Sequence, residues 1–322
     1  MPARINQAIA RLEQGWAIYY VGDHCGHVLT YEQGLADAAT WADYINVGME
    51  HGAFDMTGLA AYLRGLGAGG PTAAGYRMPA VLVEAPVGGT DEGIVRANAW
   101  QFRQILAQGV HGILLCQAES PDAVRAFVES CRYPHQLAGV DPRLPSPAER
   151  MDGARTRSPG RAPDGRRQLG VGTRGRGSES TVAEVWGIPA AEILQRADTW
   201  PLNTAGELLL GVKIESPEGV ANCEEILAVP GLGFAEIGPG DLGLSLGYTS
   251  LRVDPYPPEM QRARDRILAA CRANELAFLE LCSPDNIVAR IDEGVRIVAG
   301  HSEQTARIGR AHQQQSRRSG DG

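Results

Sequence analysis

Ionisable side chains follow several of the segments that this sequence predicts as strands. Their types are those that bind metal ions and transfer protons. A buried carboxylate at a strand end costs several kcal/mol unless a cation pairs with it, so packing alone does not explain so many of them. The pattern therefore indicates a polar site. The set consists of Glu50, His51, Glu84, Lys213, Glu215, Asp241, Glu280 and Cys282.

Glu215 and Asp241 form the pair on which a metal site would depend. Lys213 and Glu215 point to the same side of their strand, because side chains alternate with a period of two. Two carboxylates from adjacent strands, with positions left for water and substrate, suit Mg²⁺ or Mn²⁺ better than zinc. The alternative is an ion pair of Lys213 with Glu215 or Glu84 and no metal.

A glycine-rich turn and a single lysine lie close in sequence to this pair of carboxylates. The run Gly238-Pro239-Gly240 predicts a tight turn, after which the N–H groups of Gly240 and Asp241 can approach a small anion. Lys213 is the single lysine among 30 basic residues. Since arginine is bulkier and permanently charged, a lone lysine can mark a place that needs a compact cation. A coding bias with one chance survivor is the alternative, and both stay open.

Short apolar segments alternate with helical patterns along the chain, as in βα units. Eight strands, each followed by a crossover, predict a (βα)8 TIM barrel of the α/β class, whose chemistry lies at the carboxyl ends of the strands. A doubly wound sheet is disfavoured because no GxGxxG motif follows the first strand. The expected helices are 97–108, 121–132, 219–228 and 258–274. The expected strands are 17–21, 44–49, 79–84, 112–116, 209–215, 233–237, 277–281 and 296–299.

The composition, with 43% hydrophobic and 21% charged residues, is that of a globular protein. A formal net charge of −8 argues against nucleic-acid binding, and no apolar run reaches the roughly 18 residues of a membrane span. Six scattered cysteines without a CxxC pair indicate a reduced, cytoplasmic protein. We expect one domain over 1–312, with a flexible, arginine-rich insertion at 141–168, and a disordered tail at 313–322.

Other candidate residues have weaker signals. His24 and His27 follow the first strand, where an ordinary loop is the favoured interpretation. Arg174 lies in a glycine-rich loop and is expected to bind a distal carboxylate of the substrate, with a solvated loop as the alternative. Cys116 is interpreted as a packing residue, and Cys282 as the cysteine to test for reactivity.

The chain resembles the HpcH/HpaI aldolase/citrate lyase family. The specific blocks are 212–219, containing Lys213 and Glu215, and 237–242, ending in Asp241-Leu242. Met49-Glu50-His51-Gly52 and the order of the weaker blocks agree with this resemblance, which spans roughly Ala17 to Gly309 outside the insertion.

This resemblance implies a homo-oligomeric barrel, with a hexamer possible, that cleaves or forms a carbon–carbon bond next to a small 2-oxo or hydroxy acid. Glu215 and Asp241 would be the ligands of Mg²⁺ or Mn²⁺, and His51 would be the base. The amides of Gly240 and Asp241 would hold the carboxylate of pyruvate or a related 2-oxo acid. The metal would stabilise the enolate that forms on cleavage.

The sequence also departs from the family pattern. Glu84 replaces an arginine at the end of the third strand, and Lys213 replaces a glutamine two residues before the ligand Glu215. Gly48 replaces the aspartate expected three residues before His51. We interpret the exchange at Glu84 and Lys213 as compensatory, with Lys213 balancing Glu84 or polarising the substrate carbonyl.

Three other functions stay open on the sequence. Lys213 could be a Schiff-base nucleophile of an aldolase. The chain could be a citrate-lyase-like enzyme that acts on a CoA thioester, with the arginine-rich insertion as the basic groove. It could also be a relative that binds a metal or ligand without catalysis.

Overall fold

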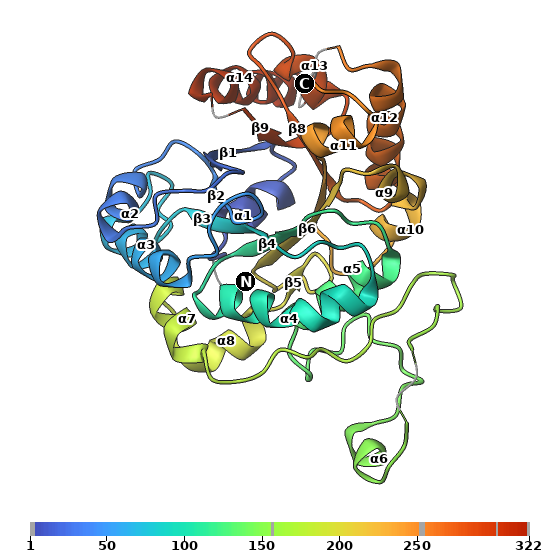
Figure 1. Ribbon diagram of the computed structural model, residues 1–322. Coiled ribbons are helices and arrows are strands. Elements are labelled where there is room, and N and C mark those ends of the chain that lie inside the picture. The colour runs from blue at the N-terminus through green and yellow to red at the C-terminus, as the bar shows by residue number, and fades with distance from the viewer. Residues whose placement is uncertain (1–3, 156–157, 251–254, 301, 321–322) are drawn as a thin grey trace.

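The computed structural model describes residues 4–155, 158–250, 255–300 and 302–320 (Figure 1). Within these ranges the strands form one parallel sheet in the order β4-β3-β2-β1-β9-β8-β7-β6-β5, and β4 also pairs with β6. The last pairing closes eight strands into a barrel and confirms the expected TIM barrel. The two-residue strand β5, which the sequence did not predict, pairs with β6 outside this ring. The strands are β1 (Ile18–Asp23), β2 (Tyr44–Gly48), β3 (Ala80–Ala85), β4 (Gly112–Leu115), β5 (Thr199–Trp200), β6 (Leu208–Ile214), β7 (Phe234–Ile237), β8 (Ala277–Leu281) and β9 (Val295–Ala299).

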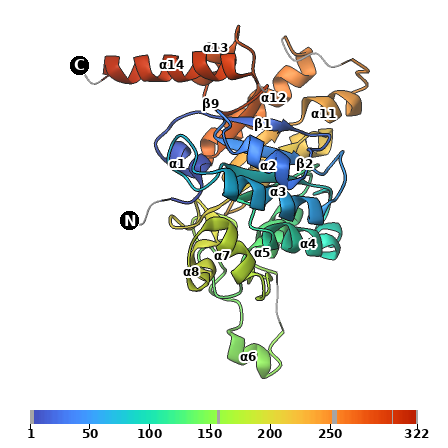
Figure 2. The same cartoon turned by 90° about the vertical axis from the view of Figure 1, so that its left-hand side faces the viewer.

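Helices surround the ring and cover its outer face (Figures 1 and 2). Because helices lie outside and side chains fill the inside, the strands are buried along most of their length. The expected helix 219–228 is divided into α9 and α10. The helices are α1 (Gln7–Glu13), α2 (Tyr31–Asp37), α3 (Met56–Gly69), α4 (Glu92–Ala107), α5 (Pro121–Cys131), α6 (Pro147–Met151), α7 (Glu179–Trp186), α8 (Ala190–Arg196), α9 (Pro217–Ala221), α10 (Cys223–Leu227), α11 (Pro239–Ser245), α12 (Pro258–Ala273), α13 (Ile287–Asp292) and α14 (Glu303–Gly320).

Helix α1 closes the amino-terminal end of the barrel. Its N-cap, Asn6, donates its side-chain amide to the carbonyl oxygens of His111 and Glu207, which directly precede β4 and β6. Ala8 and Ile9 pack into the apolar cluster of the barrel interior. Since this end is filled, the opposite end, where the strands terminate, is left as the mouth.

The barrel interior changes from apolar to polar toward the mouth. Tyr20, Tyr44 and Phe234 belong to the interior apolar cluster. Two residues further along β2 and β7, on the same side of each strand, are Asn46 and Glu236, and both are buried. The alternation of strand side chains therefore carries polar groups into the last interior layer before the mouth.

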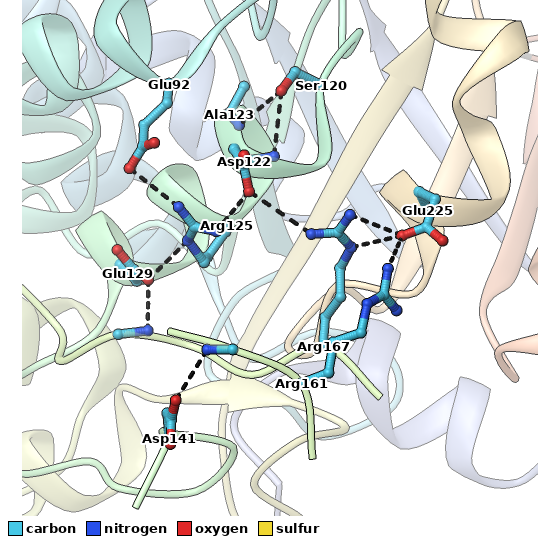
Figure 3. A network of polar contacts seen from close by, with 12 residues as sticks. Glu92, Ser120, Asp122, Ala123, Arg125, Glu129, Asp141, Arg161, Arg167 and Glu225 are labelled. Carbon is cyan, nitrogen blue, oxygen red and sulfur yellow. Dashed lines mark hydrogen bonds and ion pairs between the residues drawn. The ribbon is translucent and has the colours of Figure 1, made fainter. Parts of the chain in front are cut away.

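The insertion at 141–168 leaves the barrel, and α6 projects from it (Figures 1 and 2). Its base is closed by backbone hydrogen bonds from Asp141 to Leu169 (2.9 Å) and from Leu169 to Gly139 (2.8 Å). Arg167 contacts Glu225 of α10 at 2.7 Å and Asp122 of α5 at 3.7 Å (Figure 3). The second half of the insertion is therefore attached to the outside of the barrel by ion pairs.

The carboxyl-terminal segment differs from its expected disorder. Helix α14 continues through the predicted tail as far as Gly320. Gln313, where the tail was expected to begin, is buried, and its side-chain oxygen accepts a hydrogen bond of 2.9 Å from the N–H of Ala17. This contact anchors the polar helix to the start of β1, which its polar composition did not indicate.

Candidate active site

Glu84, at the end of β3, is the centre of a buried polar network. Its Oε1 lies 2.6 Å from Nδ1 of His24 and accepts a hydrogen bond of 2.8 Å from Asn46, whereas its Oε2 accepts one of 3.3 Å from Nζ of Lys213. The side chain of Glu84 is 1% exposed. Burial opposes its charge, but His24 and Lys213 outweigh burial and lower the pKa of Glu84 below its ordinary value. The contact expected between Lys213 and Glu84 is therefore present.

Lys213 bridges two carboxylates inside the barrel. Besides Glu84, its Nζ donates a hydrogen bond of 2.7 Å to Oε2 of Glu50, which follows β2. On the neighbouring strand β7, Glu236 is its register partner. Burial disfavours the ammonium, but the surrounding acidic groups, Glu236 first among them, raise the pKa of Lys213 above its ordinary value. The amine is therefore held in its charged form.

The loop after β1 brings a second cation to the mouth. Burial opposes the charge of His24, but contact with Glu84 outweighs it and raises the pKa of His24 to about 9. A Cβ on Gly48 would lie 2.2 Å from the backbone oxygen of His24. The loop of His24 thus occupies the space into which any side chain at position 48 would extend, which gives a steric reason for glycine there.

Glu50 and Glu215 each present one buried oxygen without a partner. Glu215 accepts a hydrogen bond of 2.7 Å from the N–H of Gln117 through Oε1, whereas its Oε2 and Oε1 of Glu50 have none. Burial raises the pKa of Glu215 to about 8. A Cβ on Gly238 would lie 2.3 Å from Oε2 of Glu215, so only glycine leaves the space beside this oxygen open.

His51 and Asp241 lie at the more exposed side of the same site. Nε2 of His51 is 3.5 Å from Oε2 of Glu50 and 3.5 Å from Oδ2 of Asp241. His51, Gly240 and Asp241 line a cavity of 330 Å³ together with Tyr248. The structure thus brings together the expected base and the expected anion-binding turn.

The residues present fit a divalent cation. Among the described residues, potential ligand atoms within 4.8 Å of one another occur in two groups: Glu50, Cys116 and Glu215, and Glu50, His51 and Asp241. The sequence paired Glu215 directly with Asp241, whereas the structure places them in different groups that share Glu50. The unpartnered carboxylate oxygens and the oxygen-rich donor set suit a divalent cation.

Three residues selected from the sequence do not join this site. Arg174 is buried beside the last turn of α4, where it donates a hydrogen bond of 3.4 Å to the carbonyl of Leu106 and lies over the ring of Tyr133. It faces away from the mouth, so this structure does not place it as a substrate ligand. Glu280 faces outward from β8 and binds Arg264 of α12 at 2.7 Å. Burial raises the pKa of Cys282 to about 12, which disfavours a reactive thiolate.

Sequence reasoning missed Glu50 as a candidate ligand and His24, Asn46 and Glu236 as members of the network. The alternation of side chains along β2 and β7 predicts that Asn46 and Glu236 face inward, because they precede the inward-facing Gly48 and Gly238 by two residues. Glu50 directly precedes the selected His51. The signal for His24 was only that it follows the first strand, because its exact position depends on the path of a loop.

Comparisons with known proteins identify the family of this chain. A sequence model of the HpcH/HpaI aldolase/citrate lyase family matches residues 83–305. The chain belongs to this family. Among relatives, the chain is 26% identical over 219 residues to a hydroxypyruvate/pyruvate aldolase of Roseobacter denitrificans. This match covers 68% of this chain and 64% of the relative. It is also 25% identical over 179 residues to a 2-keto-3-deoxy-L-rhamnonate aldolase of Klebsiella pneumoniae, and this match covers 56% of this chain and 50% of the relative. The matched segment thus spans less than two thirds of the length of these curated relatives.

Solved structures support the HpcH/HpaI fold over nearly the whole chain. An HpcH/HpaI aldolase/citrate lyase family protein from Burkholderia cenocepacia has a TM-score of 0.64 at 22% identity, covering 97% of this chain and 99% of that one. Macrophomate synthase has a TM-score of 0.58 at 21% identity, covering 99% and 91%. At these identities the likeness establishes the fold. In addition, no helix of the described residues has the length and apolar character needed to cross a membrane.

Proposed function

We propose that this protein is a divalent-metal-dependent carbon–carbon lyase of the aldolase type, which cleaves or forms a bond next to the 2-oxo group of a small acid. The observation that carries the proposal is the charge of the site. Five carboxylates lie at the mouth with two cationic groups, Lys213 and His24, and three of these carboxylates (Glu50, Glu215 and Glu236) keep an unpartnered buried oxygen. A further cation would balance such a cluster. The carboxylates are Glu50, Glu84, Glu215, Glu236 and Asp241.

Glu215 and Asp241 would hold the cation, with Glu50 between them. When bound, Mg²⁺ or Mn²⁺ would supply the positive charge that stabilises negative charge on the substrate's 2-oxo oxygen. The N–H groups of Gly240 and Asp241 would bind the carboxylate of the substrate at the edge of the 330 Å³ cavity. This arrangement orients a 2-oxo acid between the cation and His51.

His51 would act as the base. In the cleavage direction, its imidazole accepts the proton of the substrate hydroxyl while the carbon–carbon bond breaks. The electron pair of that bond passes to the carbon beside the 2-oxo group, and this carbon is then protonated. Nε2 of His51 lies 3.5 Å from Glu50 and from Asp241, and these two carboxylates would take the place of the missing aspartate at position 48 in supporting His51.

Lys213 and Glu84 would act as positioning residues. Lys213 fixes one oxygen of Glu50 and leaves the other free, while Glu84 fixes both Lys213 and His24. A Schiff base needs a neutral amine, and two carboxylates within 3.3 Å of Nζ oppose it. We therefore place metal-dependent catalysis ahead of the Schiff-base alternative.

A CoA-thioester lyase and a binding protein without catalysis have less support. Arg161 and Arg167 of the insertion are bound to Glu225 rather than arranged as a free basic groove for a CoA thioester. The family membership and the named aldolase relatives favour catalysis over metal binding alone. All six cysteines are free, which suits the cytoplasmic location that we include in the proposal together with a homo-oligomeric assembly.

A panel of 2-oxo acids with aldehydes, assayed with Mn²⁺, with Mg²⁺ and with chelator, tests the proposal. We expect turnover with either cation, none with chelator, and none in the Glu215→Gln variant. Borohydride trapping should leave Lys213 unmodified. Tight metal binding without turnover on any substrate would identify a binding protein, and trapping of Lys213 would favour the Schiff-base mechanism.

A further inference from the structure

Cys116 ends the inward-facing row of β4. Leu114, two residues earlier, belongs to the interior apolar cluster, so the thiol of Cys116 points into the barrel. Its Sγ lies within 4.8 Å of carboxylate oxygens of Glu50 and Glu215, and the residue is 1% exposed. A thiol between two carboxylates is not the apolar packing position that the sequence suggested.

Each of these two carboxylates is anchored through one oxygen only. Lys213 holds Oε2 of Glu50 at 2.7 Å, and the N–H of Gln117 holds Oε1 of Glu215 at 2.7 Å. The remaining oxygens, Oε1 of Glu50 and Oε2 of Glu215, are buried without a partner. Outer contacts that orient a carboxylate and leave its second oxygen free are typical of metal ligands.

The backbone beside Cys116 is arranged for the same contact. Gln117 has a φ of +50°, which is uncommon for a residue other than glycine and costs about 1 kcal/mol or more. This conformation accompanies the hydrogen bond from its N–H to Glu215. Strain of this kind clusters at functional sites, and here the strained residue donates the hydrogen bond that orients Glu215 beside the thiol.

We propose that Cys116 supplies a sulfur ligand to the proposed cation on the side of Glu50 and Glu215, so that the site prefers a borderline cation such as Co²⁺ or Zn²⁺ to Mg²⁺. This inference rests on the metal site of the proposed function and specifies its ligands. On binding, the S–H bond breaks, a sulfur–metal bond forms and the proton leaves to solvent. Thiolate is a soft ligand that Mg²⁺ avoids and that Zn²⁺ and Co²⁺ accept.

The test is the absorption spectrum of the metal-free, full-length protein titrated with Co²⁺. We expect a thiolate-to-cobalt charge-transfer band in the near ultraviolet for the unmodified protein and none for Cys116→Ser. The same variant should bind Co²⁺ and Zn²⁺ at least about tenfold more weakly, with little change in Mg²⁺ affinity.

Two matched controls exclude other thiols. Cys25 is exposed in the loop after β1 and could bind Co²⁺ adventitiously, whereas Cys282 is a buried cysteine at the end of β8. Cys25→Ser and Cys282→Ser should both keep the band. If Cys116→Ser fails to fold, Cys116→Ala, checked by circular dichroism, takes its place.

The outcomes separate this inference from the proposed function. The unmodified protein could bind Co²⁺ without a thiolate band, with binding lost in Glu215→Gln. That result would overturn the role of Cys116 but would still support the proposed metal site. A band that persists in the Cys116 variants overturns it as well. Absence of binding for all of Co²⁺, Zn²⁺, Mn²⁺ and Mg²⁺ by calorimetry contradicts the proposed function itself.

Discussion

Nζ of Lys213 lies 2.7 Å from Oε2 of Glu50, which joins the single lysine of the chain to the carboxylate shared by both candidate ligand groups. The pairing explains why a compact ammonium occupies this position. An arginine would bring a bulkier, planar group to the same two carboxylates. It also connects a buried structural charge to the proposed chemistry, since the orientation of Glu50 depends on Lys213.

Replacing Lys213 with Gln should remove turnover and destabilise the protein by about 3 kcal/mol, because Glu50 loses its buried cation. The double variant Lys213→Gln/Glu50→Gln should recover most of this stability, because position 50 then carries no charge and Glu84 keeps its contact with His24, but it should not recover the turnover. Chemical denaturation and the aldolase assay measure the two effects separately. Unchanged turnover in Lys213→Gln would reject its role.

Gly238→Ala should weaken metal binding by about tenfold or more. The added Cβ would lie 2.3 Å from Oε2 of Glu215 and 3.0 Å from Cδ of Lys213, so both side chains must move. Gly175→Ala is the matched control, since a Cβ there meets nothing within 4 Å. Calorimetric titration with Mn²⁺ measures both variants, and equal affinities would contradict the proposed position of the cation.

His111, beneath the barrel, should produce an acid-sensitive stability. Burial lowers its pKa from 6.5 to about 4, so the unfolded chain takes up a proton at a higher pH than the folded protein. The contribution of neutral His111 to the free energy of unfolding is fully present above pH 6.5. It is lost as the pH falls toward about 4, and the loss amounts to about 3 kcal/mol.

The His111→Gln variant tests this assignment. Glutamine can still accept the hydrogen bond of 3.1 Å that the N–H of Val81 donates to Nδ1 of His111, but it does not titrate. Denaturation between pH 4 and 7 should therefore show a shallower decline in this variant. A decline equal to that of the unmodified protein would assign the acid sensitivity to other groups.

The ion pairs of the insertion should contribute little to stability. Glu225 is half-exposed and binds Arg161 and Arg167, so Glu225→Gln should cost at most about 1 kcal/mol, and less at high salt. Asp198 binds Arg132 at 2.7 Å with both side chains at most 2% exposed. Asp198→Asn should therefore cost about 3 kcal/mol or more. Thermal denaturation at two salt concentrations compares the Glu225→Gln and Asp198→Asn variants. Similar losses of stability in the two variants would contradict the small contribution expected from the ion pairs of the insertion.

The sequence was sufficient for the features that depend on local periodicity. Eight strands were found because each is a short apolar segment between helical patterns. Lys213 and Glu215 were placed on one side of β6 because alternation along a strand is a property of the backbone. The same rule places Glu280 on the outer face of β8, opposite to the inward-facing Leu279, so its expected position at the mouth was wrong.

Contacts between distant segments were decided only by the tertiary structure. Closure of the barrel between β4 and β6 brings Gln117 and Cys116 beside Glu215, about a hundred positions away along the chain. The paths of loops placed His24 in the mouth and Arg174 outside it, although both lie in short glycine-containing segments. Side-chain direction within a strand follows from local geometry, whereas these contacts depend on how the ring closes and how each loop packs, which no local pattern encodes.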